Sequence, residues 1–123
     1  MDPLAGERYI SLATFRKSGK EVATPVWFAE RDGRYYVFSE ASAGKVKRLR
    51  NSARARVAAC DIRGRVHGDW HNAEAVLLED PDAIAEAHRT IRSKYAIQMR
   101  IADFLATLSG RIRRRAWIEI ALA

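Results

Sequence analysis

Apolar and polar residues alternate over the first third of the chain, and this alternation predicts three consecutive β-strands. The strands cover residues 8–15, 21–30 and 34–39, where tyrosine, valine and other strand-forming residues are frequent. Gly19 lies in a polar turn between the first two strands, and the Asp-Gly pair at 32–33 is typical of a two-residue hairpin. The pattern therefore indicates an antiparallel meander.

Helical spacing of apolar residues replaces this alternation in two segments. A short basic helix is expected over residues 43–50, with Ser42 as its N-terminal cap. A long helix is expected over residues 81–108, because apolar positions there recur at helical intervals. Asp80 caps the start of this second helix and Gly110 ends it. One short and one long peripheral helix are thus predicted.

Three more strand-like segments complete the pattern, at residues 54–61, 69–79 and 117–122. Strands dominate without a βαβ repeat, so the predicted fold class is mainly β (α+β), an antiparallel split β-barrel with peripheral helices. Pro25 lies within the second strand and cannot donate to a ladder, which implies a sheet edge, a bulge or an approaching ligand. The length suits a single domain over residues 1–123.

The chain is strongly basic, with a formal charge of +7, and its cations cluster in two places. One cluster lies in the short helix and the other at residues 111–115, where a solvated turn is expected. This surplus favours anionic partners, whether nucleic acid, acidic lipid or a phosphorylated ligand. Cys60 is the only cysteine and is expected in the core, and no apolar run is long enough to cross a bilayer. A cytoplasmic protein is therefore expected.

The start of the short helix is the most informative candidate site. A helix N-terminus presents unpaired N–H groups and the positive end of the helix dipole, which together favour anions. Gly44 would let an anion approach the backbone, Lys45 adds a cation in the first turn, and Arg48 lies about one turn further on. Ser39 could donate a hydroxyl from the end of the preceding strand. The alternative is a solvated basic helix without a ligand, and the glycine-rich sequence of a P-loop is missing.

Several runs of sequence resemble the pyridoxamine-phosphate oxidase-like superfamily, the FMN-binding split barrels. They are Ala13-Thr14-Phe15, Ala23-Thr24-Pro25-Val26-Trp27-Phe28, Asp32-Gly33, Tyr36-Val37-Phe38-Ser39 and Gly44-Lys45-Val46-Lys47-Arg48-Leu49-Arg50. The second and last of these runs are most similar to the branch of deazaflavin-dependent oxidoreductases. The resemblance covers most of the chain, and its specific motifs lie in the first half.

This resemblance implies a set of cofactor-binding positions. The second strand would line a flavin or deazaflavin ring, and the end of the third strand and the helix start would hold the phosphate. The residues are Thr24, Pro25, Val26, Trp27, Phe38, Ser39, Gly44, Lys45 and Arg48. Flavin-dependent members usually carry an arginine at the position of Thr24 and an Arg-Lys pair at Gly44-Lys45, so support for pyridoxamine-phosphate chemistry is missing.

The first function hypothesis is an oxidoreductase that holds coenzyme F420, with FMN as the alternative cofactor, at the interface of a homodimer. It would transfer a hydride to or from a small organic substrate, and no catalytic acid or base is assigned because the ring performs the redox step. A second hypothesis is a basic barrel that binds nucleic acid through aromatic stacking. A third is a non-catalytic flavin- or haem-binding relative of the same fold.

Several other polar residues receive structural interpretations. His67, Trp70 and His71 are close in sequence but lack the spacing of a zinc site, so no metal centre is expected. His88 is expected to point from the long helix into solvent. Tyr95 is expected in the core of the same helix.

Overall fold

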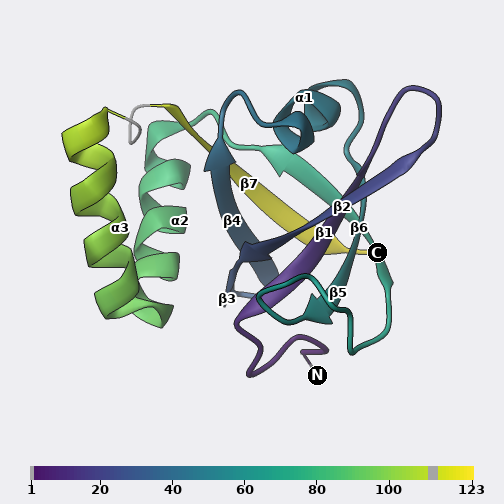
Figure 1. The fold of residues 1–123 in the computed structure, drawn as a ribbon, viewed down its shortest axis with the longest axis horizontal. Helices are drawn as coiled ribbons and strands as arrows, with labels where there is room; N and C mark the ends of the chain where they lie inside the picture. The colour runs from purple at the N-terminus through teal and green to yellow at the C-terminus, as the bar shows by residue number, and fades with distance from the viewer. Residues whose placement is uncertain (1, 111–113) are drawn as a thin grey trace.

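The computed structural model describes residues 2–110 and 114–123, and Figure 1 shows a strongly curled sheet with helices beside it. In chain order the elements are β1 (Tyr9–Phe15), β2 (Glu21–Trp27), β3 (Ala29–Arg31), β4 (Arg34–Glu40), α1 (Gly44–Asn51), β5 (Arg54–Cys60), β6 (His71–Leu77), α2 (Pro81–Lys94), α3 (Ala96–Ser109) and β7 (Arg115–Leu122). Helix α1 lies at one end of the sheet, whereas α2 and α3 stand side by side along its flank. No helix among the described residues is long and apolar enough to span a membrane.

The strands form one sheet in the order β2-β1-β5-β6-β7-β4-β3, and each neighbouring pair is antiparallel. Curling of the sheet carries β2 across the front of β4 in Figure 1, and residues of these two strands come into contact. The sheet therefore almost closes on itself and leaves a split on the side of its terminal strands. The predicted α+β split-barrel fold is confirmed.

Alternation along the strands separates two buried apolar clusters. The inside of the barrel is filled by fully buried side chains that include Leu12, Val37, Val57, Ile118 and Ile120. The second cluster joins the outer face of the sheet to the helices and includes Tyr36, Ile91, Met99 and Trp117. Because successive strand residues point to opposite faces, neighbours such as Trp117 and Ile118 contribute to different clusters.

The predicted hairpin at Asp32 and Gly33 is present between β3 and β4. Both residues have positive φ angles, 53° and 81°, as a two-residue turn of this type requires, and the Gly33 N–H donates to Glu30 Oε1 at 2.7 Å. Pro25 lies in β2, which is an edge strand with β1 as its only neighbour in the sheet. The missing N–H of Pro25 is therefore tolerated, and of the three explanations that the sequence left open the structure shows the sheet edge.

Tyr95 explains two places where the sequence prediction is wrong. The expected single long helix is two helices, because Tyr95 takes non-helical angles of φ −120° and ψ 45° between α2 and α3. The expected strand over residues 21–30 is two strands interrupted at Phe28. The Phe28 N–H and C=O bond to the Tyr95 hydroxyl at 3.3 and 2.8 Å instead of to a neighbouring strand. The Tyr95 side chain thus satisfies the backbone where the predicted strand is interrupted, and its own backbone separates α2 from α3.

The N-terminal cap of α2 agrees with the sequence prediction, whereas that of α1 differs. Asp80 caps α2, since its Oδ2 accepts from the Ala83 N–H at 3.1 Å. Ser42 does not cap α1: the N-cap is Ala43, which makes no side-chain cap. The N–H groups at the start of α1 are consequently not satisfied by a capping side chain, which leaves this terminus suited to an anion.

Replacing Tyr95 with phenylalanine is expected to lower the free energy of unfolding by about 1–3 kcal/mol, because the buried Phe28 backbone groups would lose their partner. Burial raises the pKa of Tyr95 to about 12, so the hydroxyl keeps its proton at neutral pH. Urea denaturation followed by circular dichroism measures the change. Tyr9→Phe is the matched control, and equal stability of the two variants would contradict this role.

Candidate cofactor site

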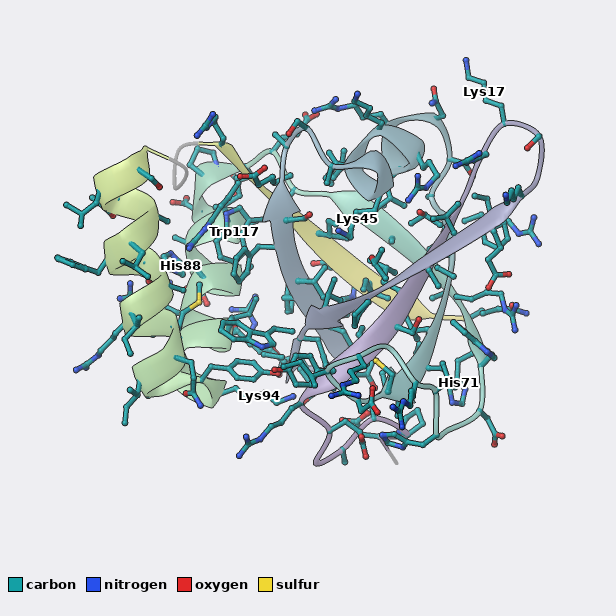
Figure 2. The ribbon with its side chains drawn as sticks, in the orientation of Figure 1. Lys17, Lys45, His71, His88, Lys94 and Trp117 are labelled. Carbon is teal, nitrogen blue, oxygen red and sulfur yellow. The ribbon has the colours of Figure 1, made fainter. Side chains whose placement is uncertain are left out.

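The side chain of Lys45 returns from the first turn of α1 toward the end of β4. Its Nζ donates to Ser39 Oγ at 3.1 Å, and Figure 2 shows the lysine lying alongside β4 beneath α1. Burial lowers the pKa of Lys45, and the nearby charge of Arg48 lowers it further. The structure therefore joins two of the predicted phosphate residues and holds a half-buried ammonium against a neutral hydroxyl.

Arg48 lies over the start of the same helix. Its Nε donates to Thr14 Oγ1 at 2.6 Å, and Thr14 is fully buried on β1. A Cβ added at Gly44 would lie 2.8 Å from Arg48 Nη1, closer than real Cβ contacts allow. Gly44 thus leaves room for the guanidinium of the chain itself, a role that the sequence analysis did not assign to it.

Lys45 and Arg48 form no ion pair with a carboxylate among the residues that the structure describes. Other arginines pair with carboxylates, as Arg56 does with Glu21 at 2.9 Å, but none of the ion pairs within the described residues involves Lys45 or Arg48. Two neighbouring, partly buried cations beside a helix N-terminus create a positive potential that favours an anion. The interpretation of this helix as merely solvated fits the exposed Lys47 but not these two residues.

Thr24 presents a buried polar atom that no described residue satisfies. Its Oγ1 is buried and has no hydrogen-bond partner in the part of the chain that the structure describes. Thr24 pairs with Leu12 on β1, so its side chain lies on the barrel-facing side of β2, as that of Thr14 does on β1. Buried hydroxyls are normally hydrogen-bonded, and an orphan one indicates a partner supplied from outside the chain, such as water or a ligand atom.

Trp27 and Phe38 bring β2 and β4 together through their rings. Trp27 contacts Phe38 edge to face, with ring centroids 6.5 Å apart, and stacks on Tyr95 at 5.0 Å with an interplanar angle of 11°. One face of the indole is therefore covered by the chain's own tyrosine. Val26 packs against the barrel core and Pro25 remains exposed, so the four predicted ring-lining residues do not share one surface.

A groove of about 520 Å³ opens where β4 ends, between the sheet and α3. Phe38 and Ser39 line it, so it begins at the strand end that also holds Lys45. Its opposite wall comes from α3 and is formed by Ala102, Leu105, Ala106 and Ser109. The lining is mostly apolar, as expected for a small-molecule site.

Two residues that contribute to this region were not singled out by their sequence pattern as site residues. Thr14 binds Arg48, and Tyr95 backs Trp27. Both come from elements distant in sequence from the residues they support, and a single strand or helix pattern carries no signal for such contacts. Thr14 belongs to a run that resembles the split-barrel superfamily, but that resemblance gave it no role.

The sequence analysis expected His88 and Arg115 to be solvated, but both side chains contact Asp103 instead. His88 Nε2 lies 2.9 Å from Asp103 Oδ2, and Figure 2 shows the histidine and Trp117 on the α2 side of the sheet. Arg115 begins β7 with its side chain only 7% exposed and donates to Asp103 Oδ1 at 2.6 Å. Residues 111–113 of the predicted turn lie outside the described residues. A buried carboxylate on α3 therefore holds two side chains, His88 and Arg115, that the sequence had placed in solvent.

His67 and Trp70, which are close in sequence, contact different parts of the chain. His67 Nε2 lies 3.2 Å from Glu7 Oε1, and Trp70 lies beneath the guanidinium of Arg56 at 4.8 Å. Cys60 is buried as expected, and burial, with nearby carboxylates, raises the pKa of its thiol to about 11. These contacts are structural.

Comparison with known proteins defines the class of this fold. HutZ, a haem storage protein of Vibrio cholerae, is 11% identical with a TM-score of 0.74 over 96% of this chain and 83% of its own. An FAD-binding protein of Mesorhizobium loti is 20% identical with a TM-score of 0.68, covering 98% and 85% of the two chains. A conserved hypothetical protein of Mycobacterium tuberculosis is 20% identical with a TM-score of 0.73, covering 98% and 76%. These similarities establish a shared split-barrel fold.

The family is shown by sequence. The family model described as pyridoxamine 5′-phosphate oxidase matches residues 2–123, so the chain belongs to this family. No curated protein matches the chain.

Proposed function

We propose that this protein is an oxidoreductase that binds a phosphate-bearing flavin-type cofactor, coenzyme F420 or FMN, at the split between β2 and β4. The observation that carries the proposal is the partly buried pair Lys45 and Arg48, which has no carboxylate partner among the described residues. A phosphate seated at the start of α1 would neutralise both cations and accept from the uncapped helix terminus.

The ring of the cofactor would lie along β2. The unsatisfied Oγ1 of Thr24 supports this location, because a polar ring edge could supply its missing partner after a small adjustment. Trp27 would form an end wall, since Tyr95 already covers one face of its indole. Thr24 and Trp27 therefore offer one polar and one aromatic contact to a ring, and the two cations of α1 fit its anionic tail. The surplus charge of +7 suits a deazaflavin whose tail carries further carboxylates.

The bound ring would supply hydride transfer, and the chain would supply binding, orientation and electrostatics. Lys45 would direct an N–H of its ammonium toward the phosphate, and the hydrogen bond from Nζ to Ser39 Oγ orients this ammonium. The apolar groove beside Phe38 would exclude water from one side of a small organic substrate. A second copy of the chain would cover the split, because one protomer leaves Pro25 and the β2 edge exposed.

Titration of the purified protein with F420, FMN, FAD and haem, followed by fluorescence and absorbance, tests this proposal. Saturable binding of F420 or FMN with a micromolar or lower Kd is expected, as for a preformed site with a charge-assisted phosphate contact. Binding of haem alone would instead indicate a function like that of HutZ.

Single-stranded DNA is the matched negative ligand. The proposed site predicts no DNA affinity comparable with that for the cofactor. Steeply salt-dependent DNA binding together with no response to any of the four cofactors would replace the proposal with a nucleic-acid-binding function.

A further inference from the structure

Helix α3 exposes an apolar stripe on the side opposite its buried residues, and one edge of this stripe, at Leu105, borders the groove beside β4. The stripe residues and their exposed fractions are Ile97 72%, Ile101 56%, Phe104 63%, Leu105 58% and Leu108 71%. In Figure 1 this helix is the outermost element, separated from the sheet by α2 over most of its length. The stripe is therefore available to another molecule.

The opposite side of α3 is also largely apolar. Met99 and Ala106 are buried against the rest of the protein, so apolar residues occupy both sides of this helix. A helix that is apolar on both sides is normally buried on both. Five large side chains exposed by more than half amount to roughly 500 Å² of apolar surface, at the upper end for a monomer and typical of an interaction site.

The spacing of the stripe identifies its partner. Ile97, Ile101, Phe104 and Leu108 are separated by four, three and four residues, the spacing of core positions in a coiled coil. This series reads the same in both directions. Two copies placed antiparallel about a two-fold axis would therefore set Ile97 against Leu108 of the second copy and Ile101 against Phe104 of the second copy, which makes the surface self-complementary.

We propose that α3 packs antiparallel against α3 of a second copy of this chain, about a two-fold axis between Ala102 and Asp103. Burial of both stripes would remove roughly 1,000 Å² of surface in total, which reaches the lower size of a specific interface. Leu105 would lie opposite Arg100 of the second copy, whose aliphatic stem can cover it while its charge stays in water.

The charges of α3 favour a second copy over a lipid surface. Arg100 is the only charged residue among the exposed positions of this helix, because Asp103 is buried. Helices that lie on membranes usually carry several lysines or arginines beside their apolar face. The remaining exposed polar residues of α3, Gln98, Thr107 and Ser109, are uncharged and suit the rim of a protein interface.

This contact goes beyond the proposed cofactor site and does not depend on it. Helix α3 is separated from α1 and β2 by α2 and the sheet in Figure 1, and Leu105 is the one stripe residue that also borders the groove beside β4. A copy bound at α3 would leave the split between β2 and β4 open. Association through the stripe and cofactor binding can therefore be lost separately.

Light scattering after size-exclusion chromatography of the full chain and of Phe104→Glu tests the proposal. The molar mass of the variant is expected to be half that of the wild type at the same micromolar concentration, whether or not a second contact also forms at the split. Gln98→Glu, which adds the same charge on the same helix outside the stripe, is expected to retain the wild-type mass. Phe104 is exposed, so the variant should keep the wild-type circular dichroism and cofactor affinity.

Cross-linking tests the antiparallel arrangement. Ile97→Cys/Leu108→Cys should give a disulfide-linked dimer under mild oxidation, whereas Ile97→Cys alone should not, because the two Ile97 positions lie at opposite ends of the contact. Buried Cys60 does not compete. Equal masses of wild type and Phe104→Glu would overturn the proposal, as would cross-linking of the single variant. Binding of wild type but not Phe104→Glu to anionic phosphatidylserine vesicles, with equal masses, would assign the stripe to a membrane instead.

Discussion

Asp103→Ala is expected to lower the free energy of unfolding by about 3–5 kcal/mol, because it would leave a buried arginine without its counter-charge. Arg115 has a side chain only 7% exposed and donates to Asp103 Oδ1 at 2.6 Å. Arg92 and His88 each approach Oδ2 at 2.9 Å, but Arg92 is half exposed and contributes less. The carboxylate ties α3 to α2 and β7, so its loss should also loosen the helices. Chemical denaturation measures the effect.

The pH dependence of stability provides a second readout. Burial alone would raise the pKa of Asp103, but hydrogen bonds from Arg115, Arg92 and His88 outweigh it and leave the pKa below its usual value of 3.8. The stabilisation is therefore fully present above pH 3.8 and is lost as the pH falls through the lower folded-state pKa. Asp103→Asn should lack this acid-side loss. Asp69→Ala, at an exposed loop position, should change stability by less than about 0.5 kcal/mol, and a similar effect of both alanine variants would contradict the role of Asp103.

Lys45→Ala is expected to weaken cofactor binding about 10- to 100-fold, which corresponds to the loss of one charge-assisted hydrogen bond. The half-buried ammonium and Arg48 are the cations that a phosphate would contact at the start of α1. Fluorescence titration with the cofactor identified above measures the change. Lys47→Ala is the matched control, because Lys47 carries the same charge on the same helix but is exposed. Equal losses in both variants would mean that only the general charge of the helix matters.

The pH profile of binding separates Lys45 from Arg48. Burial and the charge of Arg48 lower the pKa of Lys45 from its usual 10.5, so its ammonium loses a proton at a lower pH than an exposed lysine does. Cofactor affinity of the wild type should consequently fall as the pH rises, beginning below pH 10.5. Lys45→Arg should keep its affinity over the same range, because a guanidinium stays protonated. A wild-type profile that is flat to pH 10.5 would contradict a phosphate contact at Nζ.

Much of the candidate site follows from local sequence. Ser39, Gly44, Lys45 and Arg48 lie within one strand end and the first turns of the next helix, so their proximity depends mainly on short-range geometry. The structure brings Lys45 to Ser39 and Arg48 over Gly44 as this spacing allows. An edge position for Pro25 could also be inferred from sequence as one explanation, because a residue without an N–H group cannot donate to a neighbouring strand.

Tyr95 is a residue whose structural role could not be predicted from the local sequence pattern. Apolar spacing continues through it, so nothing in the helical period indicates a break between α2 and α3. Its hydroxyl instead satisfies Phe28, which lies 67 positions earlier in the chain. The same limit applies to His88 and Arg115, which look solvated until Asp103 is placed beside them.

The sequence by itself determined most of the strands, the hairpin at Asp32 and Gly33, and the basic start of α1, because alternation, turn chemistry and charge act between near neighbours. Only the tertiary structure decided the break at Tyr95, the burial of Asp103 with its cations, and the unsatisfied hydroxyl of Thr24. Each of these depends on which distant groups share a buried space, and a buried polar atom takes its partner wherever the folded chain provides one.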